Sequence, residues 1–378
     1  MADQLTKDQI RELAAVRGRC VTIAIPTSPA GRERLEGPVR LKNEIERAHA
    51  MLVAQGMRST LAHDLLMPAT ELLADQEFWM EQTRGLVILI GEGRQSFLRV
   101  PGAVPEIAVV ANRFHIRPLL AAVIDQEAYV LALDGKHTRL LRIEGEKVEE
   151  LDVPEMPRSI EEALGPEYSE KQRQMRSLGP NSHQGSVSHG AGDRGSDVKD
   201  KDLRFSQAID RALVKFLNGS HARLILAADE PMLSIYRHAS HLTTILEEPI
   251  VGSPRRATLD QLAAKARAIL THEREEQARA LLDQCHTLEP LGRTEADLNK
   301  LIGAAKEGRV ASLLLDRESV KWGFPDRDAF DVYADQAPGA EDWLNLAAIE
   351  TLANGGQVIE IDEEPELAAA GAIGTLRY

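Results

Sequence analysis

The chain has 378 residues and a formal net charge of −14 at pH 7, with 45 lysines and arginines against 59 aspartates and glutamates. Hydrophobic residues make up 43% and charged residues 28%, which is typical of globular domains and excludes a fibrous or largely disordered chain. The length predicts two or three domains. No apolar run is long enough to span a membrane, and the polar N-terminus lacks a signal-peptide pattern. We therefore expect a cytoplasmic protein.

The first third of the chain alternates between helical and strand patterns. Helices are predicted over residues 6–17, 38–55 and 59–73, and strands over 20–26, 85–90, 96–100 and 107–110. Pro68 lies inside the third helix and is expected to break or kink it. These elements predict an N-terminal α/β domain over residues 1–117.

A hairpin opens the second predicted domain, which spans residues 118–250. Strands are expected over 128–133 and 138–143, joined by the turn sequence Asp134-Gly-Lys-His137, and 144–153 can add an edge strand. Residues 205–217 follow as an amphipathic helix with a buried face that includes Phe216. A strand over 222–227 and a helix over 231–238 complete this domain.

A long segment inside the second domain, residues 165–202, has almost no hydrophobic periodicity. We predict a mobile loop, because loops of this length are usually functional or disordered. Its cations could neutralise RNA phosphates, although a solvated linker without a role fits the composition equally well. The candidate RNA-binding residues are Lys171, Arg173, Arg176, Arg194, Lys199 and Lys201, with Arg204 just beyond the segment.

The Pro-rich segment 249–254 is interpreted as the boundary to a third domain, residues 251–378. A long helix is expected from 259 to about 285, and a second one over 294–306 with Thr294 as its N-cap. A strand over 310–315, a helix over 342–353 and strands over 358–361 and 372–376 follow. This alternation predicts an α/β/α sandwich.

Two short motifs suggest chemistry, but their surroundings do not support it. Residues 190–195 fit the dinucleotide fingerprint GxGxxG, yet no apolar strand precedes them. Gly355-Gly-Gln357 contains the GGQ tripeptide of release factors, but it lies between a predicted helix and a predicted strand. Its glycines are therefore expected to form a left-handed helix C-cap.

The cysteines and histidines do not indicate a metal site. Cys20 and Cys285 are far apart and are expected to be small buried groups in a reducing compartment. The histidines lack cysteine or carboxylate partners at recognised ligand spacing, namely His183, His189, His238 and His241. We predict no metal and no cofactor.

Several stretches together resemble the bacterial archaeo-eukaryotic release factor family, whose relatives include the class-1 release factors and Pelota. In the first domain these are Ala24-Ile-Pro-Thr27, Arg40-Leu-Lys-Asn43, Glu77-Phe-Trp79 and Gly85-Leu-Val87, followed by Asn112-Arg-Phe-His-Ile-Arg-Pro-Leu119 at the entry to the second. Later in the chain they are Leu226-Ala-Ala-Asp-Glu-Pro231, Ala311-Ser-Leu-Leu-Leu-Asp316, Gly355-Gly-Gln-Val358 and Ala372-Ile-Gly-Thr-Leu-Arg-Tyr378.

The resemblance implies a tRNA-shaped protein with a release-factor-like middle domain and a C-terminal domain similar to the L7Ae/L30e ribosomal proteins. In this family the first domain inspects the decoding site, the middle domain reaches the peptidyl-transferase centre and the third docks a protein partner. The long loop lies where the family's catalytic loop lies. It carries the candidate catalytic residues His183, Gln184 and Gly185 but no GGQ.

By this resemblance we expect a factor that binds the A site of stalled or idle ribosomes, contacting rRNA and the peptidyl-tRNA site but neither DNA nor membrane. A peptidyl-tRNA hydrolase that uses Gln184 to position water is an alternative. A second alternative is a structural interaction protein that no longer binds ribosomes, which the charge of −14 favours because negative charge opposes phosphate binding.

Overall fold

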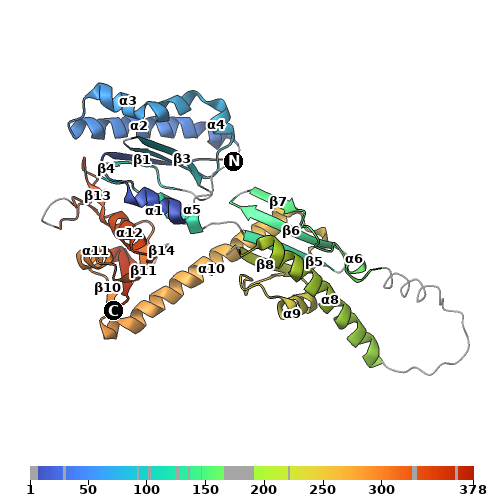
Figure 1. Cartoon of the computed structure of the whole chain (residues 1–378). Coiled ribbons are helices and arrows are strands. Elements are labelled where there is room, and N and C mark those ends of the chain that lie inside the picture. Colours follow the sequence, from blue (N-terminus) through green and yellow to red (C-terminus); the bar gives the residue numbers. More distant parts are fainter. Residues whose placement is uncertain are drawn as a thin grey trace, which may run out of the picture. The chain divides into compact units, whose positions relative to one another are not determined.

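The protein is described from a computed structural model, which covers residues 7–28, 31–91, 93–100, 102, 104–124, 128–134, 137–145, 147–165, 191–219, 222–325, 330–361 and 365–378. The fold is mixed α/β, as predicted (Figure 1). Its contacts divide it into two compact units, one of residues 1–126 with 273–378 and one of residues 127–272. The predicted limits of three domains, at 117 and 250, remain a prediction.

The N-terminal part of the first unit is an antiparallel sheet in the order β3-β2-β1-β4. Its strands are β1 (Cys20–Pro26), β2 (Gly85–Gly91), β3 (Arg94–Val100) and β4 (Ile107–Ala111). The helical segments are α1 (Lys7–Ala15), η1 (Arg32–Leu35), α2 (Glu36–Ala54), α3 (Ser59–Glu71), η2 (Leu72–Ala74), α4 (Gln76–Met80) and α5 (Arg117–Ile124). Because β2 is buried along its whole length, its sequence is a continuous apolar run rather than an alternating one.

Helices α2 and α3 cover one face of this sheet (Figure 1). Pro68 was expected to break or kink α3, and it does not break it, because the helix continues to Glu71. Leu66 and Ala69 are fully buried on either side of the proline, and the Thr70 hydroxyl donates to the Leu66 carbonyl (3.1 Å). Packing of the buried face therefore outweighs the loss of one backbone hydrogen bond.

The C-terminal part of the first unit has a four-stranded sheet in the order β10-β15-β11-β14. Its strands are β10 (Thr294–Glu295), β11 (Val310–Asp316), β14 (Gln357–Ile361) and β15 (Ala372–Leu376), with the two-stranded pair β12 (Trp322–Gly323) and β13 (Glu341–Asp342) beside it. The helical segments are the second half of α10 (Leu259–Leu288), from residue 273 on, with η4 (Glu289–Leu291), α11 (Leu298–Lys306), α12 (Trp343–Ala353) and α13 (Pro365–Ala370).

Side chains of β11 alternate between the two covered faces of this sheet. Leu313 and Leu315 pack with α11 and α12, whereas Leu314 packs with α13 and the second half of α10. The predicted α/β/α sandwich is thereby confirmed. The predicted cap at Thr294 was wrong, because Thr294 pairs with β15 and Asp297 caps α11 by accepting from the Lys300 amide (3.0 Å).

The GGQ tripeptide is part of a helix end. Gly355 follows the C-cap residue of α12 with a φ of +74°, and Gly356 packs so closely on Thr351 that a Cβ atom would lie 2.6 Å from its Cγ2. Gln357 begins β14 and donates to the Ser312 hydroxyl (3.0 Å). The predicted left-handed C-cap is confirmed.

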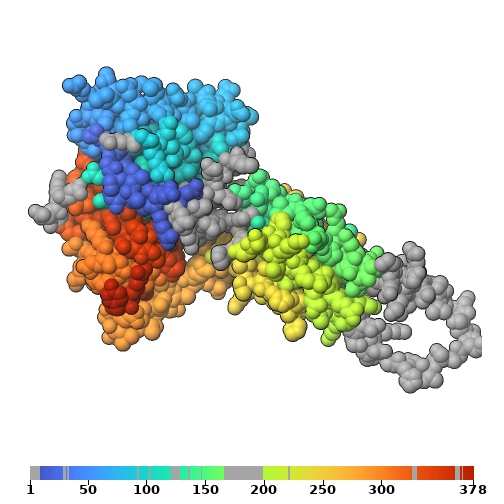
Figure 2. All heavy atoms as spheres, in the orientation of Figure 1, coloured from blue at the N-terminus to red at the C-terminus, as the bar shows by residue number. Residues whose placement is uncertain are grey.

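The N- and C-terminal parts of the first unit share one hydrophobic core. Leu13 of α1 and Phe114 belong to the same buried cluster as Leu313 of β11 and Leu344 of α12. Figure 2 shows the blue N-terminal residues directly against the orange and red C-terminal ones. The two parts therefore form a single packed body.

Arg117 is the buried ion-pair centre of this shared core, at 5% exposure. Its Nε donates to Glu360 (3.2 Å) and one terminal nitrogen to Asp342 (3.0 Å). The remaining donors reach the backbone carbonyls of Asp316 (2.7 Å), Arg317 (3.2 Å) and Ser319 (2.6 Å). All five N–H groups of a guanidinium thus have acceptors.

The second unit contains a mixed sheet in the order β7-β6-β5-β8-β9. Its elements are β5 (Ala128–Asp134), β6 (His137–Glu144), β7 (Lys147–Leu151), α6 (Ile160–Leu164), α8 (Ala191–Leu217), β8 (Arg223–Ala228), α9 (Glu230–Ala239), β9 (Ile250–Val251) and η3 (Pro254–Arg256). The antiparallel pairing of β5 with β6 and the edge position of β7 are as predicted. The predicted boundary segment 249–254 contributes β9, which pairs with β8.

Helices α8 and α9 cover one face of this sheet, and the first half of α10 covers the other. Phe205, Ile209 and Leu213 are buried as predicted, but Phe216 is 38% exposed, so its assignment to the buried face was wrong. Both cysteines are buried and free, as expected. None of the helices within the described ranges combines the length and apolarity needed to cross a bilayer.

Replacing Arg117 by methionine tests the ion-pair centre. The variant keeps an apolar stem but leaves Asp342, whose side chain is fully buried, without its cation, and leaves the buried Glu360 with only Arg317 at 3.9 Å. We expect the free energy of unfolding to fall by about 3–5 kcal/mol in chemical denaturation. The control is Arg279→Met, which removes an exposed pair with Glu275 and should cost at most about 0.5 kcal/mol. Equal losses in both variants would contradict this role.

A second prediction concerns His115, which is 4% exposed. Burial, reinforced by Arg117 and opposed by Asp342, lowers its pKa from 6.5 to about 4. The unfolded chain therefore binds a proton at a higher pH than the folded chain does. The stabilisation is complete above about pH 6.5 and is lost as the pH falls towards 4.

The full loss corresponds to about 3 kcal/mol. We expect the free energy of unfolding of the wild type to fall by this amount more than that of His115→Phe when both are measured by denaturation between pH 7 and pH 4. Parallel pH profiles for the two proteins would show that His115 does not contribute.

Candidate functional site

The insertion that carries the candidate loop begins after α6 in the second unit. Ser159 caps α6 by accepting from the Glu162 amide (3.3 Å), and Gly165 ends it with a φ of +73°. The candidate catalytic residues His183, Gln184 and Gly185 lie outside the described residues, as do Lys171, Arg173 and Arg176. Their roles therefore remain predictions.

The last part of the predicted loop is helical. Helix α8 begins at Ala191, so Arg194, Lys199 and Lys201 lie on its first turns, and the expectation of a loop up to 202 was wrong there. These turns contain polar residues and no apolar stripe, which explains why the hydrophobic pattern starts only at Phe205. Gly192 and Gly195 are also helical, so they do not form the turn that a dinucleotide fingerprint requires.

The described cations of α8 differ in their surroundings. Lys199 is exposed, whereas Lys201 is half-buried and has an interaction partner. Arg204 is exposed and pairs with Asp200 one turn before it (3.0 Å). Such exposed pairs stabilise a helix by only about 0.3–0.5 kcal/mol, so they break easily when a stronger anion such as a phosphate approaches.

A buried carboxylate fixes α8 to the end of α9. Asp210 is 1% exposed and accepts from the Ser240 hydroxyl (2.6 Å), the His241 amide (3.1 Å) and His241 Nδ1 (2.8 Å). Burial raises the pKa of Tyr236 above its ordinary range, and the nearby Asp210 adds to the rise. The phenol therefore stays neutral, and the cluster holds the helices in place.

Sequence reasoning missed the role of Asp210. The available signal was an aspartate inside a helical face that is otherwise apolar, but its partner lies 31 residues later in the chain. His241 was interpreted as a cap or surface group, and its side chain is 84% exposed. Within the described residues no group of three or more His, Cys, Asp or Glu side chains could hold a metal ion.

The middle of the chain matches a known protein family. Residues 129–309, which include almost all of the second unit, match the model of bacterial archaeo-eukaryotic release factor family 3. The chain is therefore related to this family, and its middle part is release-factor-like, as the resemblance predicted. No curated protein matches the chain.

Solved structures of translation factors align with most of the chain at low identity. The archaeal translation termination factor aRF1 is 14% identical over 99% of this chain and 98% of its own, with a TM-score of 0.22. Dom34 of S. cerevisiae, a translation termination-like factor, is 12% identical over 75% of this chain and 72% of its own, with a TM-score of 0.40. An archaeal Pelota in a ribosome-bound model with ABCE1 is 12% identical over 99% and 94%, with a TM-score of 0.37.

Proposed function

We propose that the protein is a cytoplasmic translation factor that binds the A site of stalled or idle ribosomes. The observation that carries the proposal is the family match over residues 129–309, because this range contains both the folded middle unit and its long insertion. In this proposal the insertion contacts rRNA near the peptidyl-tRNA site, and the C-terminal part binds a protein partner.

The charge distribution supports this proposal locally. The whole chain carries −14, which opposes binding to RNA. From Lys171 to Gly192, however, the sequence contains three cations and no aspartate or glutamate, whereas the whole segment 165–202 carries six lysines and arginines against six aspartates and glutamates. Counterion release from phosphates depends on such local clusters rather than on the charge of the whole protein.

Peptidyl-tRNA hydrolysis is the second candidate activity. It is favoured by Gln184 beside Gly185 in the insertion, because a glutamine next to flexible backbone can position water against an ester. The GGQ at 355–357 does not serve this purpose, since its residues are engaged in the end of α12 and the start of β14.

Co-sedimentation with purified ribosomes tests the proposal. We expect the protein to bind bacterial ribosomes with an affinity that falls steeply with salt. The triple variant Lys171→Ala/Arg173→Ala/Arg176→Ala should bind more weakly at low salt, and its slope of log affinity against log salt should be smaller by about 2–3. A matched control replaces three exposed cations on α2 and α10, namely Lys42, Lys265 and Arg279.

The results separate the candidate functions. Binding that prefers vacant ribosomes indicates an idling factor, and a preference for ribosomes loaded with peptidyl-tRNA indicates rescue. Gln184→Ala should leave binding intact, and it should abolish release of the peptide only if the protein is a hydrolase. Absence of binding at low salt would contradict the proposal and leave a structural interaction protein.

A further inference from the structure

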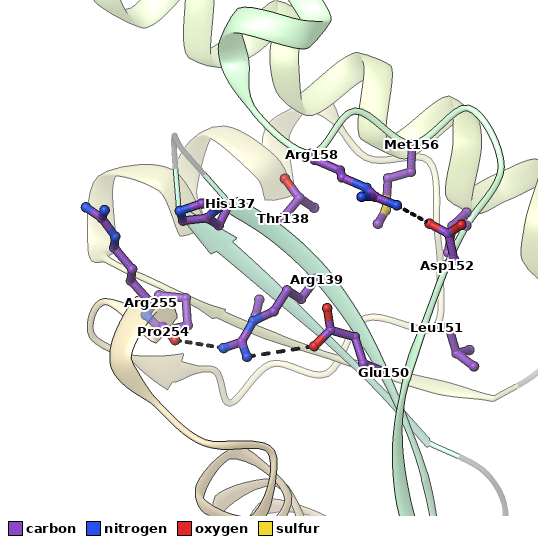
Figure 3. A pocket seen from close by; sticks show the side chains of 12 residues that line it. His137, Thr138, Arg139, Glu150, Leu151, Asp152, Met156, Arg158, Pro254 and Arg255 are labelled. Carbon is purple, nitrogen blue, oxygen red and sulfur yellow. Dashed lines mark hydrogen bonds and ion pairs between the residues drawn. The ribbon is translucent and has the colours of Figure 1, made fainter.

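A pocket of about 640 Å³ opens in the second unit, between the start of β6, the end of β7 with the segment after it, and η3 (Figure 3). It lies on residues of the folded sheet and not on the insertion. The apolar part of its lining includes Val153 and Met156, both buried, and the half-buried Leu151. Its volume is in the range of small-molecule sites.

A buried hydroxyl without a hydrogen-bond partner lines this pocket. Thr138 is 6% exposed, and within the described structure its Oγ1 has no partner, although its backbone amide donates to the Arg158 carbonyl (2.8 Å). Buried polar groups are nearly always satisfied, and an unsatisfied one is costly. A polar atom of a ligand in the pocket would supply the missing partner.

Positively charged side chains surround the pocket, and one of them is unpaired. Arg139 is held by the Pro254 carbonyl (2.9 Å) and lies 3.9 Å from Glu150, and Arg158 pairs with Asp152 (2.8 Å) (Figure 3). Arg255 is exposed and has no ion pair among the residues that the structure describes. Arg255, next to an exposed His137, is therefore the cation that a ligand can meet without displacing a carboxylate, whereas Arg158 would first have to leave its exposed pair with Asp152.

We infer that this pocket binds one nucleotide, with the base against the apolar lining and Thr138 and the phosphate at Arg255. An inorganic phosphate would leave the apolar lining and the buried hydroxyl unused, and it would face Glu150 and Asp152. A base offers both a flat apolar surface and polar edges, and flat guanidinium groups such as those of Arg139 and Arg158 can stack on it. The nucleotide can be a free mononucleotide or one unpaired residue of an RNA strand.

The inference that the nucleotide belongs to an RNA strand rests on the proposed function, whereas the inference that the pocket binds a nucleotide does not. Because the lining belongs to β6, β7 and the segments beside them, this site would be a second contact in addition to the insertion. It would recognise an unpaired residue of RNA, since a base that is paired and stacked inside a duplex cannot also enter the pocket.

Equilibrium binding to the full chain tests the inference. The probes are the four ribonucleoside 5′-monophosphates, the unphosphorylated nucleosides, inorganic phosphate, a five-residue single-stranded RNA and the matching duplex. We expect monophosphates to bind more tightly than nucleosides and phosphate. Arg255→Ala should weaken monophosphate binding by about 5–10-fold and leave nucleoside binding unchanged, because only the phosphate contact is lost.

Thr138→Val is a second test, in which stability and affinity should change in opposite directions. The substitution preserves shape and removes an unsatisfied buried hydroxyl, so the thermal midpoint of the free protein should rise while affinity for nucleosides and nucleotides falls about 5-fold. The control Arg279→Ala should change neither. A fall in the thermal midpoint together with unchanged affinity would overturn the role of Thr138.

The probes also identify the source of the nucleotide. Tighter binding of single-stranded RNA than of monophosphates assigns the pocket to RNA, and equal binding assigns it to free nucleotides. Phosphate that binds as tightly as the monophosphates, or no binding of any nucleotide or RNA, would overturn the inference. If the protein still co-sediments with ribosomes in that case, the proposed function stands without this pocket. If the protein binds nucleotides but does not co-sediment with ribosomes, the pocket stands and the proposed function is contradicted.

Discussion

The first unit depends on a single buried guanidinium. Arg117 comes from the segment that leaves the N-terminal sheet, and all of its acceptors belong to the C-terminal part of the chain, about 200 residues or more away. Taking a cation out of water is costly unless every donor finds an acceptor. The two carboxylates and three carbonyls around Arg117 meet that condition, so the correct docking of the two parts is strongly preferred over alternatives.

Residues next to Arg117 make further hydrogen bonds between the N- and C-terminal parts of the first unit. Asn345 of α12 is buried and bonds to two backbone groups of the approaching segment, accepting from the Ile116 amide (2.8 Å) and donating to the Phe114 carbonyl (3.1 Å). Arg113 donates to Glu341 (2.6 Å). The backbone amide of Ile116 and the carbonyl of Phe114 lie in a segment without regular secondary structure, and they find their hydrogen-bond partner in a side chain of the C-terminal part.

Local sequence patterns were sufficient for most strands and helices. The strands from Cys20 and from Val310 are continuous apolar runs because both faces of their sheets are covered, and the helix from Phe205 has a clear buried stripe. The failures occur where a local rule was opposed by packing or lacked a signal. Pro68 is tolerated because its neighbours remain buried, and residues 191–202 form helix without an apolar pattern.

The functional features were less accessible from sequence than the fold. The partners of Arg117 and Asp210 are distant in the chain, and the pocket at Thr138 combines residues from three separate segments. No periodicity relates such positions. The GGQ tripeptide shows the opposite case, in which a motif suggests function but its place between a helix and a strand already predicts a structural role.

The most direct test of A-site binding is competition with tRNA on programmed ribosomes. Ribosomes carrying a peptidyl-tRNA in the P site would be incubated with labelled aminoacyl-tRNA and increasing amounts of the protein, and A-site occupancy would be measured by filter binding. We predict that the protein displaces the aminoacyl-tRNA and leaves the P-site tRNA in place. Simultaneous binding of the protein and a full complement of A-site tRNA would contradict the account.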